Sequence, residues 1–376
     1  MAAFPEFMTV SVKLINPQMA SPPTASESHP ETICVVRLSA IGDTCHALAV
    51  VRTLQDSFPD AKLTWIIGKT EAALLGDIPD IEFIIFDKSN GLSAYRKLRR
   101  QLGARRFDVC LCMHASMRAN GVYALLRSSR KIGFDRQRAR DFQWLFTNQK
   151  IPARPQQHVL DGLMEFATTI GANRGDLRWN IPLDGATRGF ATEILPGDTP
   201  SLLISPCSSQ RSRNYRNWPV EHYVAIARRA QEEYAAKIVV TGGHSQLEKH
   251  YGEAICGQLD AAADNLVGKT SLKQLLALIE RTTLVLCPDS GPAHMATAVN
   301  TPVVGLYATS NPERTGPYLS QHLVVNAYPQ ASLEFCGKTV ADLAWGERIR
   351  HPKAMLLVKI EDVWDKVEQV LQKTTI

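Results

Sequence analysis

The sequence has 376 residues, of which 45% are hydrophobic and 21% are charged, and its formal net charge is +5. This length is greater than that of one ordinary domain and suits two domains. The composition is typical of a globular protein rather than a disordered or fibrous one. Apolar runs fall short of the roughly 20 residues that span a bilayer, and the N-terminus lacks a secretion signal. We therefore expect neither membrane spanning nor secretion.

The chain is expected to begin with a mobile extension, residues 1–31, which is rich in Ser, Pro and Thr and has no apolar period. Strand-like runs and helical patterns then alternate through a first domain, residues 32–185. Its strands are expected at 33–38, 63–67, 83–86 and 107–112, and its helices at 44–57 and 95–102. Such alternation predicts a parallel sheet covered by helices.

A stretch punctuated by Pro and Gly interrupts this rhythm, so we predict a linker at 186–199 and a second domain at 200–355. Its strands are expected at 202–205, 237–240, 265–267, 284–287 and 303–306, and its helices between Trp218 and Tyr234 and at 271–279. A C-terminal amphipathic helix within 356–376 is expected to pack on a core. The predicted fold class is α/β, with two doubly wound Rossmann-like domains and a ligand cleft at the carboxyl ends of their strands.

The eight cysteines occupy positions 34, 45, 110, 112, 207, 256, 287 and 336 and include no Cys-x-x-Cys pair. Several lie in apolar strand-like runs. We interpret them as reduced core thiols and predict no metal site.

Residues 37–44, Arg-Leu-Ser-Ala-Ile-Gly-Asp-Thr, lead from the first strand into the first helix. The segment lacks the Gly-x-Gly-x-x-Gly spacing that brings the backbone close to a dinucleotide, which disfavours a nicotinamide or flavin enzyme. It carries one carboxylate, Asp43, at a turn expected to face the cleft. Asp43 is either an N-cap for the first helix or a catalytic general base.

Residues 284–296 run from a strand through a polar turn into a helix, whose free N–H groups and positive dipole end would bind a phosphate or diphosphate. The candidate donor-binding residues here are Asp289, Ser290, Gly291, Pro292 and His294. The alternative is an ordinary crossover capped by Asp289 or Ser290, with His294 packed in a core.

Two more polar loops follow strands of the second domain. Residues 208–219 offer hydroxyls and guanidinium charges that suit an anionic leaving group, and the donor-binding candidates are Ser208, Ser209 and Arg216. Residues 241–245 contain a Gly-Gly pair, which allows the backbone to approach a sugar but is also a common turn. His244 is the candidate in this loop.

Basic residues crowd the stretch from Arg96 to Arg140, which indicates an anionic partner for the first domain. For Arg96 to Arg106 a solvated helix face explains the pattern equally well. The stretch has too few aromatic residues to indicate nucleic-acid binding. The candidate acceptor-binding residues are Arg118, Arg130, Lys131, Arg136, Arg138 and Arg140.

Several segments together carry a family resemblance. They are Arg-Leu-Ser-Ala-Ile-Gly-Asp at 37–43, Asn-Trp-Pro at 217–219, Asp-Ser-Gly-Pro-Ala-His at 289–294 and Thr-Pro-Val-Val-Gly-Leu-Tyr at 301–307. In this order and spacing the chain resembles glycosyltransferase family 9, the ADP-heptose:lipopolysaccharide heptosyltransferases, over nearly all of residues 33–370.

The resemblance implies a GT-B fold whose first domain binds the acceptor and whose second domain binds an ADP-sugar. It implies that Asp43 is the catalytic base, that Arg216 replaces a lysine on the donor phosphate, and that 289–294 cover the diphosphate. The chain departs from the family pattern at His244, where a glutamate often binds the donor ribose. It departs again at 308–310, where Ala-Thr-Ser replaces Gly-Pro-Thr.

The implied function is inverting, metal-independent transfer of heptose from ADP-L-glycero-D-manno-heptose to the Kdo, or phosphorylated Kdo, of lipid A in the inner core of lipopolysaccharide. No cofactor is implied besides this donor substrate. The enzyme is expected in the cytoplasm, peripheral to the inner membrane through its basic residues. The alternatives are a sugar-nucleotide epimerase or hydrolase of the same fold, another family 9 core transferase with a different acceptor, and a non-catalytic module that binds lipid or nucleic acid.

Overall fold

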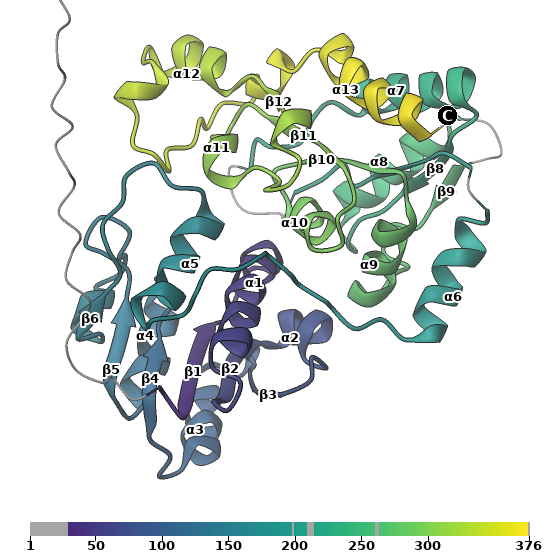
Figure 1. Cartoon of the computed structure of the whole chain (residues 1–376). Helices are drawn as coiled ribbons and strands as arrows, with labels where there is room; N and C mark the ends of the chain where they lie inside the picture. Colours follow the sequence, from purple (N-terminus) through teal and green to yellow (C-terminus); the bar gives the residue numbers. More distant parts are fainter. Residues whose placement is uncertain (1–28, 198, 209–213, 260–262, 375–376) are drawn as a thin grey trace, which may run out of the picture.

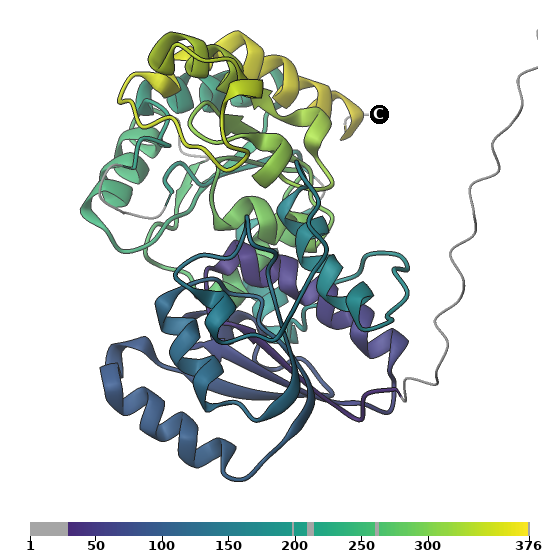
Figure 2. The same ribbon diagram turned by 90° about the vertical axis from the view of Figure 1, so that its left-hand side faces the viewer.

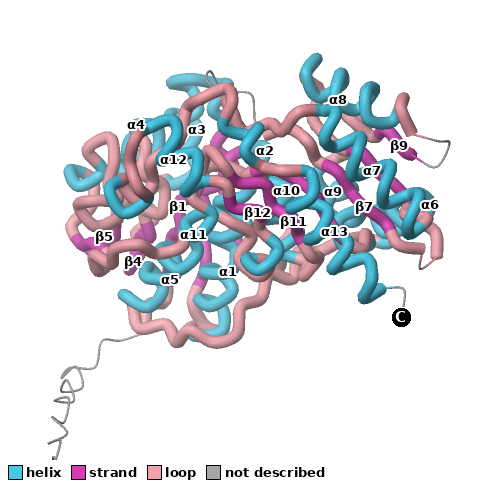
Figure 3. Tube along the Cα trace, turned by 90° about the horizontal axis from the view of Figure 1, so that it is seen from above, coloured by secondary structure: helices cyan, strands magenta, loops and turns pink. Residues whose placement is uncertain are grey.

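The computed structural model describes residues 29–197, 199–208, 214–259 and 263–374. Residues 1–28 of the predicted extension lie outside this part of the chain. The described residues form two parallel six-stranded sheets (Figure 1), and a view from above shows helices on both sides of the strands (Figure 3). This arrangement confirms the predicted α/β class with two Rossmann-like domains.

The first sheet has the strand order β3-β2-β1-β4-β5-β6. Its strands are β1 (Thr32–Arg37), β2 (Lys62–Gly68), β3 (Ile81–Phe86), β4 (Phe107–Leu111), β5 (Ser128–Gly133) and β6 (Gln149–Lys150). Its helices are α1 (Ile41–Ser57), α2 (Lys69–Leu75), α3 (Gly91–Leu102), α4 (Met117–Leu125) and α5 (Val159–Thr169), with short 3-10 helices η1 (Lys88–Asn90) and η2 (Gln143–Leu145). Central β1 is apolar and almost wholly buried, as expected when helices cover both faces of a parallel sheet.

The second sheet has the strand order β12-β11-β10-β7-β8-β9. Its strands are β7 (Ser201–Ile204), β8 (Lys237–Val240), β9 (Ala263–Asn265), β10 (Leu284–Pro288), β11 (Val303–Tyr307) and β12 (Val325–Asn326). Its helices are α7 (Val220–Tyr234), α8 (Gln246–Cys256), α9 (Leu272–Arg281), α10 (Gly291–Ala298), α11 (Pro312–Thr315), α12 (Tyr328–Cys336) and α13 (Ile360–Thr374), with η3 (Gln321–Leu323), η4 (Val340–Asp342) and η5 (Ala354–Leu357). Central β10 is buried along its whole length.

Most predicted elements are confirmed to within a few residues, and β8 has the predicted bounds. Helix α1 begins three residues earlier than predicted, because its N-cap is Ala40, which has no capping side chain to mark the start. Residues 186–199, predicted as a linker, contain most of helix α6 (Gly185–Ile194), which packs against α9. The C-terminal helix α13 packs on the second core, as predicted, with the guanidinium of Arg229 4.4 Å above the ring of Trp364.

The cysteines are unpaired thiols in the described residues, and most of them are buried. The prediction of core thiols is wrong for Cys336, which is exposed because it ends the surface helix α12. Among the described residues, none of the helices is both long enough and apolar enough to cross a bilayer.

The two domains meet where α1 of the first domain packs against α10 of the second. Figures 1 and 2 show these helices facing each other between the sheets. At the contact, a Cβ built on Gly291 would lie 3.6 Å from Ile41, and one built on Gly42 would collide with the ring of His294. Because α1 follows β1 and α10 follows β10, this contact brings the carboxyl ends of the two sheets toward each other.

Candidate active site

Asp43 lies in the first turn of α1, where its carboxylate is held by the end of β1. Arg37 Nη2 lies 2.7 Å from Asp43 Oδ2, and the backbone N–H of Ala40 donates to the same oxygen at 3.3 Å. Arg37 is fixed in turn, because its Nη1 donates to the carbonyl of Met113 at 2.6 Å. The Asp43 side chain keeps 38% of its surface exposed. The predicted N-cap position is wrong, since Asp43 occupies the third helical position, although its carboxylate still accepts a bond from the cap residue.

The surroundings of Asp43 favour its ionised form. Burial alone raises the pKa of this carboxyl, but the Arg37 charge, the Ala40 N–H and the nearby His294 lower it further than burial raises it. The net pKa therefore lies below the ordinary aspartate value. Asp43 is thus an ionised carboxylate at neutral pH, with exposed surface from which it can accept a proton.

The amino end of α10 faces α1 across the domain contact. Its N-cap is Ser290, whose side chain makes no capping hydrogen bond within the described residues, and Pro292 occupies its first turn. The alternative of a helix capped by the Ser290 side chain therefore does not fit, and the first N–H groups of α10 are not used by that cap. His294 is 8% exposed, and its ring centroid lies 4.5 Å from that of His46. This burial matches the packed-core interpretation of His294.

Asp289, just before α10, is the centre of a polar network. Arg216 Nη1 donates to the Asp289 carbonyl at 2.8 Å and lies 3.4 Å from its Oδ2. The Ser310 hydroxyl donates to the same Oδ2 at 2.8 Å, and Arg348 Nη2 lies 3.8 Å from it. Asp289 therefore holds Arg216 at the amino end of α10 and brings Arg348 to the same place.

The two loops predicted after β7 and β8 differ in their exposure. Ser208 is buried, and its backbone N–H donates to Asn217 Oδ1 at 3.0 Å. Ser209 lies outside the described residues. His244 is exposed and packs beside Gly268. The Glu248 carboxylate accepts a 2.7 Å bond from Gly243 N–H, so the glycine loop holds a carboxylate that sequence reasoning missed. The Ser-x-x-Glu capping pattern at 245–248 was its only signal.

The six predicted acceptor residues do not share one environment. Arg118, Arg136 and Arg140 are exposed. Arg130 and Lys131 lie in the middle of β5, away from its carboxyl end, and Lys131 Nζ donates to the Tyr123 carbonyl at 3.0 Å.

Arg138 is held by three internal acceptors: the Asp135 carboxylate, Gln157 Oε1 at 2.9 Å and the Pro152 carbonyl at 2.7 Å. Of the six residues, Arg140 extends to the second domain. A Cβ added to Gly346 of that domain would lie 3.8 Å from Arg140 Nη2. By contrast, the basic residues of α3 are exposed, so the solvated-face interpretation holds for Arg96, Lys97, Arg99 and Arg100.

Arg314, on α11, lies at the candidate site and was not predicted from the sequence. The same Cβ on Gly346 would lie 3.4 Å from Arg314 Nε, so the guanidinium groups of Arg140 and Arg314 converge. Burial lowers the pKa of Arg314; the charges of Asp43 and Asp289 raise it, and those of Arg140 and Arg348 lower it. Arginine stays protonated under such a shift. The cleft thus holds several cations beside two carboxylates, which suits an anionic ligand.

Comparison with known proteins agrees with this geometry. The sequence pattern of glycosyltransferase family 9 (heptosyltransferase) matches residues 95–341. The lipopolysaccharide core heptosyltransferase OpsX of Haemophilus influenzae is 38% identical over 341 residues, which cover 91% of this chain and 97% of that protein. The chain belongs to glycosyltransferase family 9.

Solved structures of family 9 members share the fold at low sequence identity. A family 9 glycosyltransferase from Veillonella parvula has a TM-score of 0.76 and 21% identity, covering 91% of this chain and 98% of that one. The Escherichia coli heptosyltransferase WaaC, solved with ADP, has a TM-score of 0.68 and 18% identity, covering 91% and 99%. The GT-B fold expected for a family 9 chain is confirmed.

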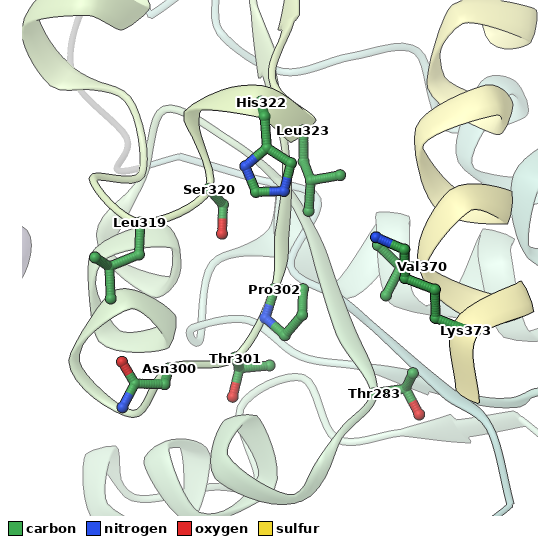
Figure 4. A pocket seen from close by; sticks show the side chains of 10 residues that line it. All are labelled: Thr283, Asn300, Thr301, Pro302, Leu319, Ser320, His322, Leu323, Val370 and Lys373. Carbon is green, nitrogen blue, oxygen red and sulfur yellow. The ribbon is translucent and has the colours of Figure 1, made fainter.

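One cavity in this family 9 chain lies away from the cleft. It measures about 370 Å³ and is lined by Thr283, Asn300, Thr301, Pro302, Leu319, Ser320, His322, Leu323, Val370 and Lys373 (Figure 4). Thr283 and Pro302 directly precede β10 and β11, so the cavity lies at the amino ends of these strands. Ligands of doubly wound sheets bind at the opposite edge, and we assign this cavity no part in the site.

Proposed function

We propose that this heptosyltransferase moves heptose from ADP-heptose to a hydroxyl of the Kdo that is linked to lipid A, with inversion at the anomeric carbon. The observation that carries the proposal is the position of Asp43, an ionised carboxylate at the amino end of α1, opposite the amino end of α10. A base facing an anion-binding helix end is the arrangement that a direct displacement from a sugar diphosphate requires.

In the proposed reaction Asp43 accepts the proton of the acceptor hydroxyl as that oxygen attacks the anomeric carbon. The bond between the anomeric carbon and ADP breaks on the opposite face, and ADP takes the electron pair. Arg37 keeps the carboxylate in one orientation and lowers its pKa, so the base is ionised at neutral pH but only weakly basic. Proton transfer is therefore expected late, when positive charge has developed on the sugar.

The negative charge that grows on ADP is met by fixed cations and helix amides. Arg216 is held against Asp289 beside α10, and Arg314 and Arg348 lie near the same carboxylate. We propose that these guanidinium groups and the first N–H groups of α10 stabilise the leaving diphosphate without a metal ion. Ser208, His244 and the backbone at 289–294 are the further donor contacts that we propose.

For the acceptor, the exposed Arg118, Arg136 and Arg140 support a ligand that carries carboxylate or phosphate groups. Kdo linked to lipid A has this chemistry, with or without a phosphate on the Kdo. The 38% identical relative from Haemophilus influenzae bears the name of a lipopolysaccharide core heptosyltransferase, which supports the same substrate class. Because this acceptor is a lipid, we propose that the enzyme works at the cytoplasmic face of the inner membrane.

The test is an assay of the full chain with ADP-heptose, with and without Kdo-lipid A or its phosphorylated form. We expect ADP release only when acceptor is present, one heptose added by mass, an inverted anomeric linkage by NMR, and activity in EDTA within about twofold of the untreated enzyme. Turnover of ADP-heptose alone would indicate an epimerase or hydrolase. Transfer only to an acceptor that already carries heptose would assign the enzyme to a later step of core biosynthesis. Loss of activity in EDTA that Mg²⁺ restores would contradict metal independence.

A further inference from the structure

Four large apolar side chains are exposed together on the first domain. Met117, Phe142, Trp144 and Leu145 are each 62% exposed, and we call them the η2 patch. Met117 begins α4, and its backbone N–H donates to Asp141 Oδ2 at 3.1 Å, so this helix end adjoins the η2 turn. Scattered exposed apolar residues are ordinary, but a contiguous group on a polar surface marks an interaction site.

The η2 turn is held rigidly in this exposed position. Gln143, within the turn, is completely buried; its Nε2 donates to the Cys112 carbonyl at 2.7 Å, and its Oε1 accepts from Phe134 N–H at 3.2 Å. Phe142 has φ 60°, a left-handed conformation that costs energy for a bulky residue. The buried amide therefore anchors the turn, while the residues on either side of it point outward.

The surroundings of the η2 patch are strongly basic. Residues 116–154 contain nine Lys or Arg, two Asp and no Glu. Asp135 pairs with Arg138, Arg154 pairs with Glu165 Oε1 at 2.9 Å, and Asp141 accepts from the Met117 N–H. Exposed aromatic and leucine side chains beside arginines are the composition of a surface that binds anionic lipid, because the rings enter the headgroup region and the guanidinium groups contact phosphates.

The η2 patch also borders the cleft. Gln143 bonds to Cys112, which directly follows β4, and β4 lies beside β1, the strand that leads to Asp43. Arg140, three residues before Gln143, extends to Gly346 of the second domain. A lipid surface in contact with the η2 patch would therefore lie next to the acceptor side of the cleft.

We propose that the η2 patch inserts into the surface of an anionic lipid bilayer and that Arg118, Arg136 and Arg140 contact its headgroups. The choice of a bilayer as the partner rests on the proposed function, in which the acceptor is a membrane lipid. The insertion itself needs no acceptor, and this separates the two proposals experimentally.

The test is sedimentation of the full chain with vesicles that contain no acceptor. One set contains phosphatidylethanolamine and phosphatidylglycerol, and the other contains phosphatidylcholine alone. We expect binding to the anionic vesicles, a decrease of at least about tenfold in partitioning for the Phe142→Ser, Trp144→Ser double variant, and no change for Leu333→Ser. Leu333, 63% exposed on α12, is the matched control. Trp144 is the most exposed of the six tryptophans. Brominated lipid should therefore quench the tryptophan fluorescence of the wild type but not that of Trp144→Phe.

Several results would overturn the inference: no binding to anionic vesicles, equal binding by the double variant, or binding only to vesicles that carry the acceptor. Self-association that the same substitutions abolish would identify the η2 patch as a contact between copies. Transfer to a short water-soluble Kdo acceptor should stay intact in the double variant, which also shows that this variant folds. If the wild-type chain binds anionic vesicles but transfers no heptose, the proposed function is wrong. The assignment of the η2 patch as a membrane-binding surface is then still supported.

Discussion

Gly42 of α1 lies directly against the imidazole of His294 of α10, so that any side chain at position 42 would collide with Cδ2 of that ring. The glycine is therefore required by the close approach of the two domains and not by its own backbone, whose φ is not positive. The adjacent residue is Asp43. The contact that demands a glycine thus also sets the Asp43 carboxylate opposite the amino end of α10.

We predict that Gly42→Ala lowers the free energy of unfolding by about 1–3 kcal/mol and also lowers kcat/KM, because overpacking separates α1 from α10. Denaturant unfolding of Gly42→Ala, His294→Ala and the double variant measures the coupling between the two sites. Gly189→Ala, where an added Cβ meets open space on α6, is the control and should be neutral or stabilising. If Gly42→Ala and Gly189→Ala are equally stable, the contact does not constrain the domains.

The pH dependence of the reaction should depend on Arg37. Its charge lowers the pKa of Asp43, so Arg37→Gln should raise that pKa and move the acid limb of the kcat/KM profile to higher pH. The wild-type limb should lie at or below the ordinary aspartate range, because the base is lost only as pH falls through its lowered pKa. Arg96→Gln, on the exposed face of α3, serves as the control. If the acid limb of the Arg37→Gln profile lies at the same pH as that of the wild type, this limb does not report the titration of Asp43.

Three histidines, His46, His158 and His294, are buried at the domain contact. We expect His158 to give the clearest effect of pH on stability. Burial lowers its pKa to about 4; its Nδ1 accepts from Leu160 N–H at 3.1 Å, and its Nε2 lies 3.0 Å from the Gly316 carbonyl of the second domain. The folded protein therefore favours the neutral ring, whose stabilising effect is complete above the ordinary pKa of 6.5 and is lost as pH falls toward 4.

We predict that the free energy of unfolding decreases by about 2–3 kcal/mol more for the wild type than for His158→Gln between pH 7 and pH 4. Urea unfolding at several pH values measures this difference. His250→Gln, at an exposed position on α8, should keep the wild-type dependence. Parallel curves for wild type and His158→Gln would show that this ring does not titrate with unfolding.

The sheets were predictable from the sequence because parallel strands buried on both faces are local apolar runs, as β8 and β10 illustrate. Asp43, Arg216 and Asp289 became candidates because Asp43 and Asp289 closely follow strands and Arg216 lies in the polar loop after β7. Arg314 and Arg348 were missed, because their neighbours Arg140 and Asp289 are distant in sequence and only the folded domain contact assembles them. The start of α1 was missed for a local reason, since Ala40 carries no capping signal.

Donor and acceptor recognition should depend on different arginines. Replacing Arg216 or Arg314 by Ala should raise the KM for ADP-heptose and lower kcat. The reason is that the negative charge on the leaving ADP grows as its bond to the sugar breaks. Replacing Arg136 or Arg140 should raise the acceptor KM and weaken the dependence of rate on ionic strength, with each lost charge-assisted bond costing about 1.5–3 kcal/mol. Full kinetics in both substrates distinguish the sets. An altered donor KM with an unchanged acceptor KM in Arg136→Ala would contradict this division.

The central claim is that Asp43 is the base, and its most direct test is the single-turnover rate of Asp43→Asn with ADP-heptose and a Kdo-lipid A acceptor, measured alongside ADP-heptose binding. Asparagine keeps the size of the side chain and can still contact Ala40 N–H, but it cannot accept the hydroxyl proton. We expect the rate to fall by about 10²–10⁴-fold while the Kd for ADP-heptose stays within about twofold of the wild-type value. An Asp43→Asn enzyme that turns over at the wild-type rate would contradict the account.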